Sequence, residues 1–145
     1  MALVIIRVRN QPPRERYRTS LSQADIPVSE QKTVKKESGL EYIETRIGTG
    51  EPAKVGSKLK VFYTGTLRDG KKFDGNVGED PMAVTIGETR LISGFAEGLL
   101  GIKKGGKRKI LVPYKIGYGD SGSPPKIPPK ADLIFDLEVT EVVNR

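Results

Sequence analysis

Alternating apolar and polar positions predict a β-hairpin near the middle of the chain. From Leu59 to Leu67 an apolar residue recurs at every second position, apart from Gly65, and this is the period of a strand with one buried face. Asp69-Gly70 comes next, and glycine readily adopts the positive φ that a tight turn requires. The pattern therefore predicts a hairpin whose returning strand begins at residues 71–73.

Three further segments are expected to be strands. Residues 133–139 alternate in the same way, with Ile134 as the one apolar residue on the polar side, and they predict a long central strand. Residues 107–112 predict a strand that Pro113 ends, because proline cannot continue a hydrogen-bonded ladder. Residues 40–47 predict another.

Helical spacing occurs at one place, where Ile92, Phe95, Ala96 and Leu99 follow the i, i+3, i+4, i+7 pattern and Gly101 is a suitable stop. A helix of about two turns is not stable alone in water, so its apolar stripe must lie against the sheet. The predicted fold is an α+β domain in which a curved antiparallel sheet, a half-barrel, wraps around one short α-helix.

The N-terminal segment differs in composition from the rest. Residues 1–39 hold eight Lys or Arg against four Asp or Glu, together with Pro12-Pro13 and a single aromatic residue. This composition predicts a flexible basic arm, followed by a folded domain at residues 40–145. The alternation of Val4, Ile6 and Val8 offers a second interpretation of part of the arm, as a short strand added to a sheet edge.

Charge and hydropathy limit the partners. The net charge of +7 and the cluster at residues 107–109 suggest nucleic-acid binding. Alternating charges along a strand, without an exposed aromatic platform, argue against it.

The apolar run at residues 3–6 is too short for a membrane span or a signal-peptide core, so we expect no membrane association. With Met1 as the natural start, we expect a cytoplasmic protein, and a monomer.

The sequence contains no His and no Cys. Thiol nucleophiles, disulfides, Cys/His zinc sites and imidazole bases are therefore excluded.

Two segments match nucleotide-binding motifs in sequence but not in the elements that surround them. In GIKKGGK, residues 101–107, Arg108 stands where a Ser or Thr should ligate magnesium, and a strand follows. GYGDSG, residues 117–122, runs into Ser123-Pro124-Pro125, which cannot open a helix.

The segment at residues 117–129 contains three Gly and four Pro. A loop of this length in a small domain is usually functional, although it also serves as a stiff crossover before the last strand. Tyr118 and Ile127 near its ends favour a role as the wall of an apolar pocket.

Four blocks of the chain, in order and spacing, resemble the FKBP-type peptidyl-prolyl cis-trans isomerases. They are VFYTGTLRDGKKFD at 61–74, GFAEGLLGIKKGGKRKILVP at 94–113, GYGDSGSPPKIPP at 117–129 and LIFDLEV at 133–139. The resemblance runs from about residue 40 to residue 142. It implies acceleration of X-Pro rotation in polypeptide substrates, as a protein-folding helper, in an apolar pocket that accepts the prolyl ring.

The resemblance also assigns site residues by motif. It implies catalytic positions at Tyr63, Asp74 and Tyr118, and substrate-binding positions at Phe73, Met82, Val84, Leu91, Ile92, Phe95, Ile127 and Phe135. It further implies that loop backbone near Ile127 hydrogen-bonds one substrate carbonyl, while Tyr118 binds another. For Phe95 and Phe135, ordinary core packing is a competing interpretation.

This chemistry needs no metal and no cofactor. The barrier to X-Pro rotation comes from the partial double bond of the amide, which twisting removes. The twisted carbonyl is less dipolar than the planar one, so a dry apolar pocket favours it without any nucleophile.

Several residues depart from the common pattern of the family. Phe95 stands where many members have Trp, and Met82 and Val84 replace aromatic residues. Arg90 replaces an acidic residue, Ser123 a His and Lys126 an aliphatic residue, and an Arg often found near residues 76–78 is missing. We therefore expect a looser and more positive pocket rim, reduced activity and weak macrolide binding. The alternative is a catalytically weak binding or chaperone module that recruits a partner through the pocket or the basic arm.

Overall fold

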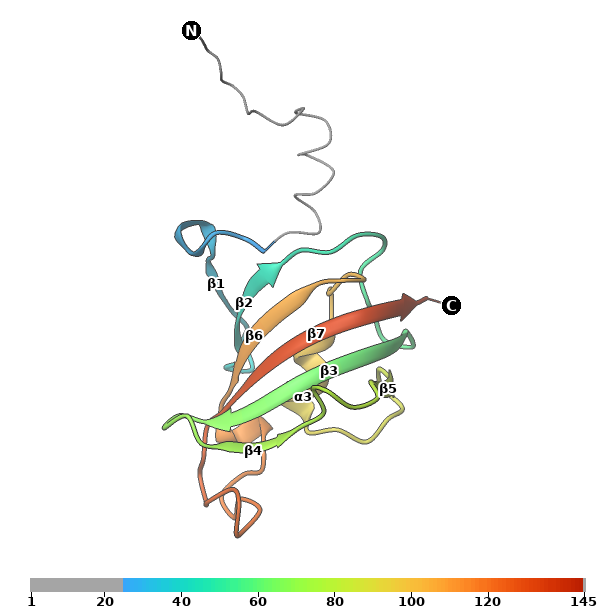
Figure 1. Cartoon of the computed structure of the whole chain (residues 1–145). Helices are drawn as coiled ribbons and strands as arrows, with labels where there is room; N and C mark the ends of the chain where they lie inside the picture. The colour runs from blue at the N-terminus through green and yellow to red at the C-terminus, as the bar shows by residue number, and fades with distance from the viewer. Residues whose placement is uncertain (1–24, 145) are drawn as a thin grey trace, which may run out of the picture.

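One curved antiparallel sheet forms the frame of the protein (Figure 1). The structure, a computed structural model, describes residues 25–144. Its strands are β1 (Thr33–Lys35), β2 (Glu41–Arg46), β3 (Lys58–Leu67), β4 (Lys72–Gly75), β5 (Met82–Thr85), β6 (Lys107–Val112) and β7 (Leu133–Val143). The helix α3 is Ser93–Leu99, and short 3-10 turns occupy Val28–Glu30 and Tyr114–Ile116.

The strand order places the last strand in the centre of the sheet. Neighbours run β1-β2-β6-β7-β3-β4, and β5 pairs with β3 beyond the end of β4. In the register of β3 with β7, Tyr63 lies opposite Leu137 and Gly65 lies opposite Phe135. The expected hairpin is confirmed, since β3 and β4 pair and Gly70 has a φ of 91° in the turn between them.

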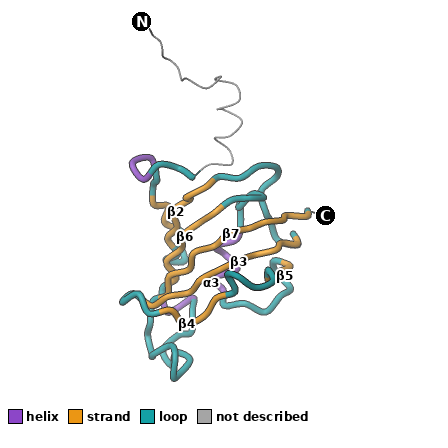
Figure 2. Tube along the Cα trace, in the orientation of Figure 1, coloured by secondary structure: helices purple, strands orange, loops and turns teal. Residues whose placement is uncertain are grey.

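The helix α3 lies across the concave face of the sheet (Figure 2). Two glycines let it approach β6 closely. A Cβ on Gly98 would lie 2.6 Å from Cδ1 of Ile110, and one on Gly94 would overlap Cγ1 of Val112. The close approach seals a core whose members come from the inward positions of the strands and from the helix, among them Leu59, Val61, Phe95, Leu99, Ile110, Leu133 and Val139.

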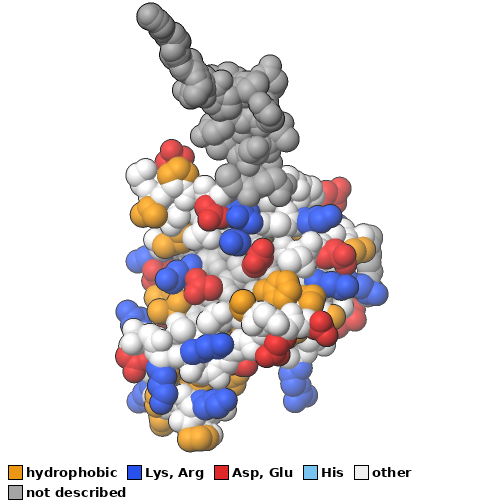
Figure 3. Space-filling model, viewed as in Figure 1, with side chains coloured by type: hydrophobic (Ala, Val, Ile, Leu, Met, Phe, Trp, Pro, Cys, Tyr) orange, Lys and Arg blue, Asp and Glu red, His pale blue; other side chains and the backbone are white. Residues whose placement is uncertain are grey.

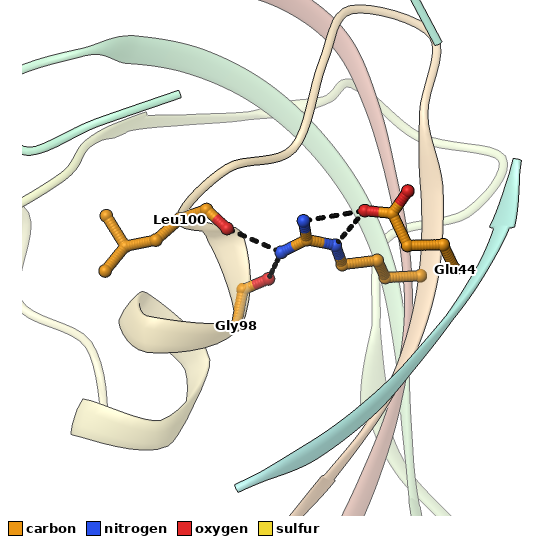
Figure 4. A network of polar contacts seen from close by, with 4 residues as sticks. Glu44, Gly98 and Leu100 are labelled. Carbon is orange, nitrogen blue, oxygen red and sulfur yellow. Dashed lines mark hydrogen bonds and ion pairs between the residues drawn. The ribbon is translucent and has the colours of Figure 1, made fainter. Parts of the chain in front are cut away.

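A buried arginine ties the end of α3 to the sheet (Figure 4). The guanidinium of Arg108 on β6 donates to the carbonyls of Gly98 and Leu100, and it pairs with Glu44 on β2 at 2.7 Å. The ring of Tyr42 lies 4.4 Å from the guanidinium carbon. Four partners therefore satisfy a cation whose side chain is only 4% exposed.

The face of the sheet turned away from α3 carries charges of both signs (Figure 3). On this face Lys107 lies opposite Glu138, and Lys109 lies opposite Asp136. Since Arg108 points into the fold, the basic cluster that suggested nucleic-acid binding does not form a continuous positive surface. No helix among residues 25–144 is long and apolar enough to cross a membrane.

The sheet begins earlier in the chain than the sequence pattern indicated. The composition predicted a basic arm that ends at residue 39, whereas β1 pairs with β2 from Thr33, and Asp25 bridges to Arg46. The side chains of β1 are all exposed, so no buried alternation marked it in the sequence. The strand considered at residues 4–8 lies outside the described residues.

Candidate functional site

A hollow of about 360 Å³ opens on the concave side of the sheet. Most of its lining is apolar or aromatic, as in small-molecule and peptide sites of this size. The lining residues are Tyr63, Phe73, Asp74, Met82, Arg90, Leu91, Ile92, Phe95, Tyr118 and Phe135. They come from β3, β4, β5, β7, α3, the loop before α3 and the loop between β6 and β7.

Four rings form a connected aromatic wall. Phe135 packs edge-to-face on Phe95 at 5.0 Å and on Phe73 at 5.7 Å between ring centroids. Tyr63 completes the wall, 5.5 Å from Phe95. Gly65 makes room for it, because a Cβ there would lie 2.6 Å from Cζ of Phe73. Edge-to-face rings interlock, so the wall is a preformed apolar surface.

One carboxylate at the rim is held from two sides. The Tyr63 hydroxyl donates to Oδ2 of Asp74 at 2.9 Å, and the N–H of Gly75 donates to Oδ1 at 2.8 Å. Burial raises the pKa of Tyr63 to about 12, and the bond to Asp74 adds to the effect. The hydroxyl therefore stays protonated at neutral pH and keeps Asp74 oriented at the mouth of the hollow.

Two backbone N–H groups at the hollows differ in whether a partner occupies them, and the expected contact from loop backbone near Ile127 stays a prediction. Ile127 N–H donates to the carbonyl of Ser123 at 3.0 Å and is already occupied. Ile92, the N-cap of α3, lines the hollow, and within the described part of the chain its N–H has no acceptor. The first N–H groups of any helix lack partners in the helix, and the sequence pattern did not single out this N–H.

A second hollow of about 330 Å³ adjoins the first. The two share Phe73, Asp74 and Tyr118, and the second is completed by residues 123–127 of the Gly/Pro-rich loop. The Tyr118 side chain, 40% exposed, lies at their junction. Together the hollows, which meet at these three residues, form a continuous cleft.

The structure brings nine of the eleven predicted site residues to the main hollow. Ile127 is buried and lines the adjoining hollow instead. Val84 was predicted to bind substrate, but its side chain lies in the core, opposite Leu59, and lines neither hollow. Only 2% of Val84 is exposed. Met82 lies opposite Val61, two residues nearer Tyr63 along β3, which is why it reaches the hollow and Val84 does not.

Arg90 lines the hollow but was not among the predicted site residues. Arg90 departs from the common family pattern, and its position directly before Leu91 and Ile92 was the available signal. Within residues 25–144, no group of three acidic side chains is arranged to hold a metal ion.

The fold and the hollow define a half-barrel domain with an aromatic pocket and polar groups at the mouth of that pocket. The sequence model described as FKBP-type peptidyl-prolyl cis-trans isomerase matches residues 49–140. The chain belongs to this family.

Individual relatives agree with the assignment. The chain is 41% identical over 105 residues to an FK506-binding protein of Neisseria meningitidis, covering 72% of this chain and 96% of the relative. It is 43% identical over 102 residues to FK506-binding protein 4 of Dictyostelium discoideum, covering 70% of this chain and 28% of that protein. The chain thus spans little more than a quarter of the Dictyostelium protein.

Solved structures show the same fold. The crystal structure of FkpA from Escherichia coli superposes with a TM-score of 0.70 at 37% identity, covering 89% of this chain and 57% of that one. The expected curved sheet around one helix is therefore confirmed.

Proposed function

We propose that this chain accelerates cis-trans rotation of X-Pro bonds in polypeptides. The observation that carries the proposal is the aromatic wall of Tyr63, Phe73, Phe95 and Phe135 around a hollow of about 360 Å³, in a chain of this isomerase family. A prolyl ring in this hollow leaves water, and the amide beside it twists where little solvent stabilises the planar, more dipolar form.

The polar groups at the mouth hold the substrate backbone. The N–H of Ile92 and the hydroxyl of Tyr118 are the donors at the hollow for the carbonyls on either side of the proline. Asp74, oriented by Tyr63 and Gly75, offers its remaining acceptor positions to the substrate. Fixing the flanking backbone while one amide rotates lowers the barrier by positioning, without a covalent step.

The test is exchange NMR spectroscopy of a short X-Pro peptide with catalytic amounts of the chain. Uncatalysed exchange takes tens of seconds or longer, so acceleration is easily seen. Asp74→Ala and Tyr118→Ala should each lower kcat/KM about fivefold, the value of one hydrogen bond of about 1 kcal/mol. Lys60→Ala, with its side chain on the outer face of β3, is the matched control and should leave the rate unchanged.

A folded chain that accelerates no X-Pro peptide would contradict the proposal. It would favour the alternative, a binding or chaperone module that recruits a proline-containing partner through the same hollow. Unchanged rates in both variants of an active chain would place the catalytic groups elsewhere.

Macrolide binding is a further proposal, supported by the names of relatives that bind FK506. Phe95 and Met82 supply the apolar surface, while Arg90 adds a charge at the rim, so we propose weak binding. Inhibition of the isomerase by rapamycin measures it, and inhibition at stoichiometric concentrations would contradict it. Action as a monomer and a cytoplasmic location stay predictions.

A further inference from the structure

Two cations line the proposed substrate cleft. Arg90 lines the main hollow and Lys126 lines the adjoining one, and both side chains are exposed. The ion pairs within residues 25–144 are Arg46–Asp25, Arg68–Asp132 and Arg108–Glu44. Arg90 and Lys126 belong to none of them, so their charges are available to a bound molecule.

The cleft contains little negative charge to balance these cations. Asp74 is the one carboxylate that lines either hollow, and both its oxygens already accept hydrogen bonds. Glu79 lies near enough to affect Tyr63 but lines neither hollow. The lining therefore has a surplus of positive charge beside an apolar centre.

The geometry relates these charges to the residues that flank a bound proline. The two hollows meet at Phe73, Asp74 and Tyr118. When the main hollow holds the prolyl ring, a peptide that continues past Tyr118 reaches Lys126. Arg90 is two residues before Ile92, whose N–H is the proposed donor to the substrate backbone. Side chains next to the proline thus pass within the field of one or both cations.

We propose that this site selects X-Pro segments with an acidic residue next to the proline, with Arg90 and Lys126 as the residues that determine this specificity. The proposal rests on the proposed isomerase function. Exposed ion pairs are weak, so the expected preference is about two- to fivefold over a neutral residue, and charge repulsion disfavours a basic residue by a similar factor.

The experiment compares two sets of short peptides, with Glu, Gln or Lys directly before or directly after the proline. Exchange NMR gives kcat/KM for the full chain, for Arg90→Gln, for Lys126→Gln and for the double variant. Lys60→Gln serves as the control, since this lysine lies on the outer face of β3. The ratio of Glu to Gln peptide within each variant cancels any general change in activity.

We expect the ratio to exceed one for the full chain and for Lys60→Gln, and to fall to about one in the double variant. We also expect it to fall at 1 M salt, where the screening length is about 3 Å. A ratio of one in the full chain, or a preference that survives in the double variant, overturns the proposal. If no peptide is accelerated, the isomerase proposal has failed, and the affinities of the same peptides from chemical-shift titration then decide the charge preference separately.

Discussion

Tyr63 combines two roles in one side chain. Its ring belongs to the aromatic wall, 5.5 Å from Phe95, while its hydroxyl holds Asp74 at the rim. Phenylalanine would preserve the first role and remove the second, so Tyr63→Phe separates apolar packing from orientation of the carboxylate.

The raised pKa of Tyr63 predicts a dependence of stability on pH. Since the pKa in the folded chain, about 12, lies above the ordinary value of 10.0, folding favours the protonated hydroxyl. This contribution is complete below about pH 10 and is lost as the pH rises toward 12. At neutral pH, Tyr63→Phe should lower the free energy of unfolding by about 0.5–1.5 kcal/mol, the value of one hydrogen bond.

Urea unfolding of wild type and Tyr63→Phe between neutral pH and about pH 11 checks this prediction. The difference in their free energies of unfolding isolates the contribution of the one hydroxyl. The difference should be constant up to about pH 10 and then shrink. A difference that stays constant beyond that pH would show that the hydroxyl is not preferentially protonated in the folded state.

For single residues, the sequence predicted which side chains face the core better than how far each lies from the hollow. Alternation assigned Leu59 and Val61 to the buried face, and the motifs brought Tyr63 to the site. Neither could separate Met82 from Val84, because the two side chains share a face of β5 and differ only in distance from the hollow. The free N–H of Ile92 was missed because backbone hydrogen bonds depend on which carbonyls the fold brings near.

The helix α3 depends on two glycines in different surroundings. Behind Gly94 lie Val112 and the carbonyl of Ile116, whereas behind Gly98 the three nearest heavy atoms all belong to the Ile110 side chain. Valine has one preferred rotamer and a carbonyl cannot move alone, while the end of an isoleucine adjusts more easily.

Gly94→Ala and Gly98→Ala should therefore differ. Alanine gains about 1 kcal/mol in helix propensity over glycine at either position. At Gly98 we expect stability within about 1 kcal/mol of wild type, and at Gly94 a loss of about 1–3 kcal/mol from overpacking. Thermal unfolding measures both. Equal effects would mean that the helix shifts as a unit to relieve either contact.

Arg108 connects three elements, and its geometry predicts the cost of losing it. Arg108→Lys keeps the charge but cannot reach Glu44 and the carbonyls of Gly98 and Leu100 together. We expect a loss of about 2–4 kcal/mol in urea unfolding, because buried groups are left unpaired. Glu44→Gln keeps an acceptor at a side chain that is 28% exposed, so its loss should be smaller. Equal losses would indicate that the carbonyl contacts contribute little.

Elements with a buried face were predicted, and an element without one was not. Strands β3, β6 and β7 and the helix carry apolar periodicity, and the sequence placed each of them within a few residues. Strand β1 has three exposed side chains and is held only by pairing with β2, so no pattern within the segment encodes it.

On the scale of the whole molecule, β1 affects how much of the N-terminal segment the folded domain needs for full stability. A chain of residues 40–145 lacks β1 and the Asp25–Arg46 ion pair that residues 25–145 keep. We expect the shorter chain to fold with about 1–2 kcal/mol less stability, because exposed pairing contributes only a few net hydrogen bonds.

Activity per folded molecule should be equal in the two chains, since no residue lining either hollow precedes residue 40. Urea unfolding and exchange NMR measure both quantities. Equal stability would show that β1 is dispensable, and lower activity of the folded shorter chain would show that the edge of the sheet influences the site.

The central position of β7 has a consequence for synthesis. β7 lies between β6 and β3, so the strands made first have no direct pairing that joins β1-β2-β6 to β3-β4-β5. No strand pairing joins the two halves until residues 133–143 have left the ribosome, and contacts this distant in sequence form slowly. During that interval the unpaired edges of β3 and β6 are exposed to other chains, so a protein proposed to help others fold itself passes through a stage in which it needs protection.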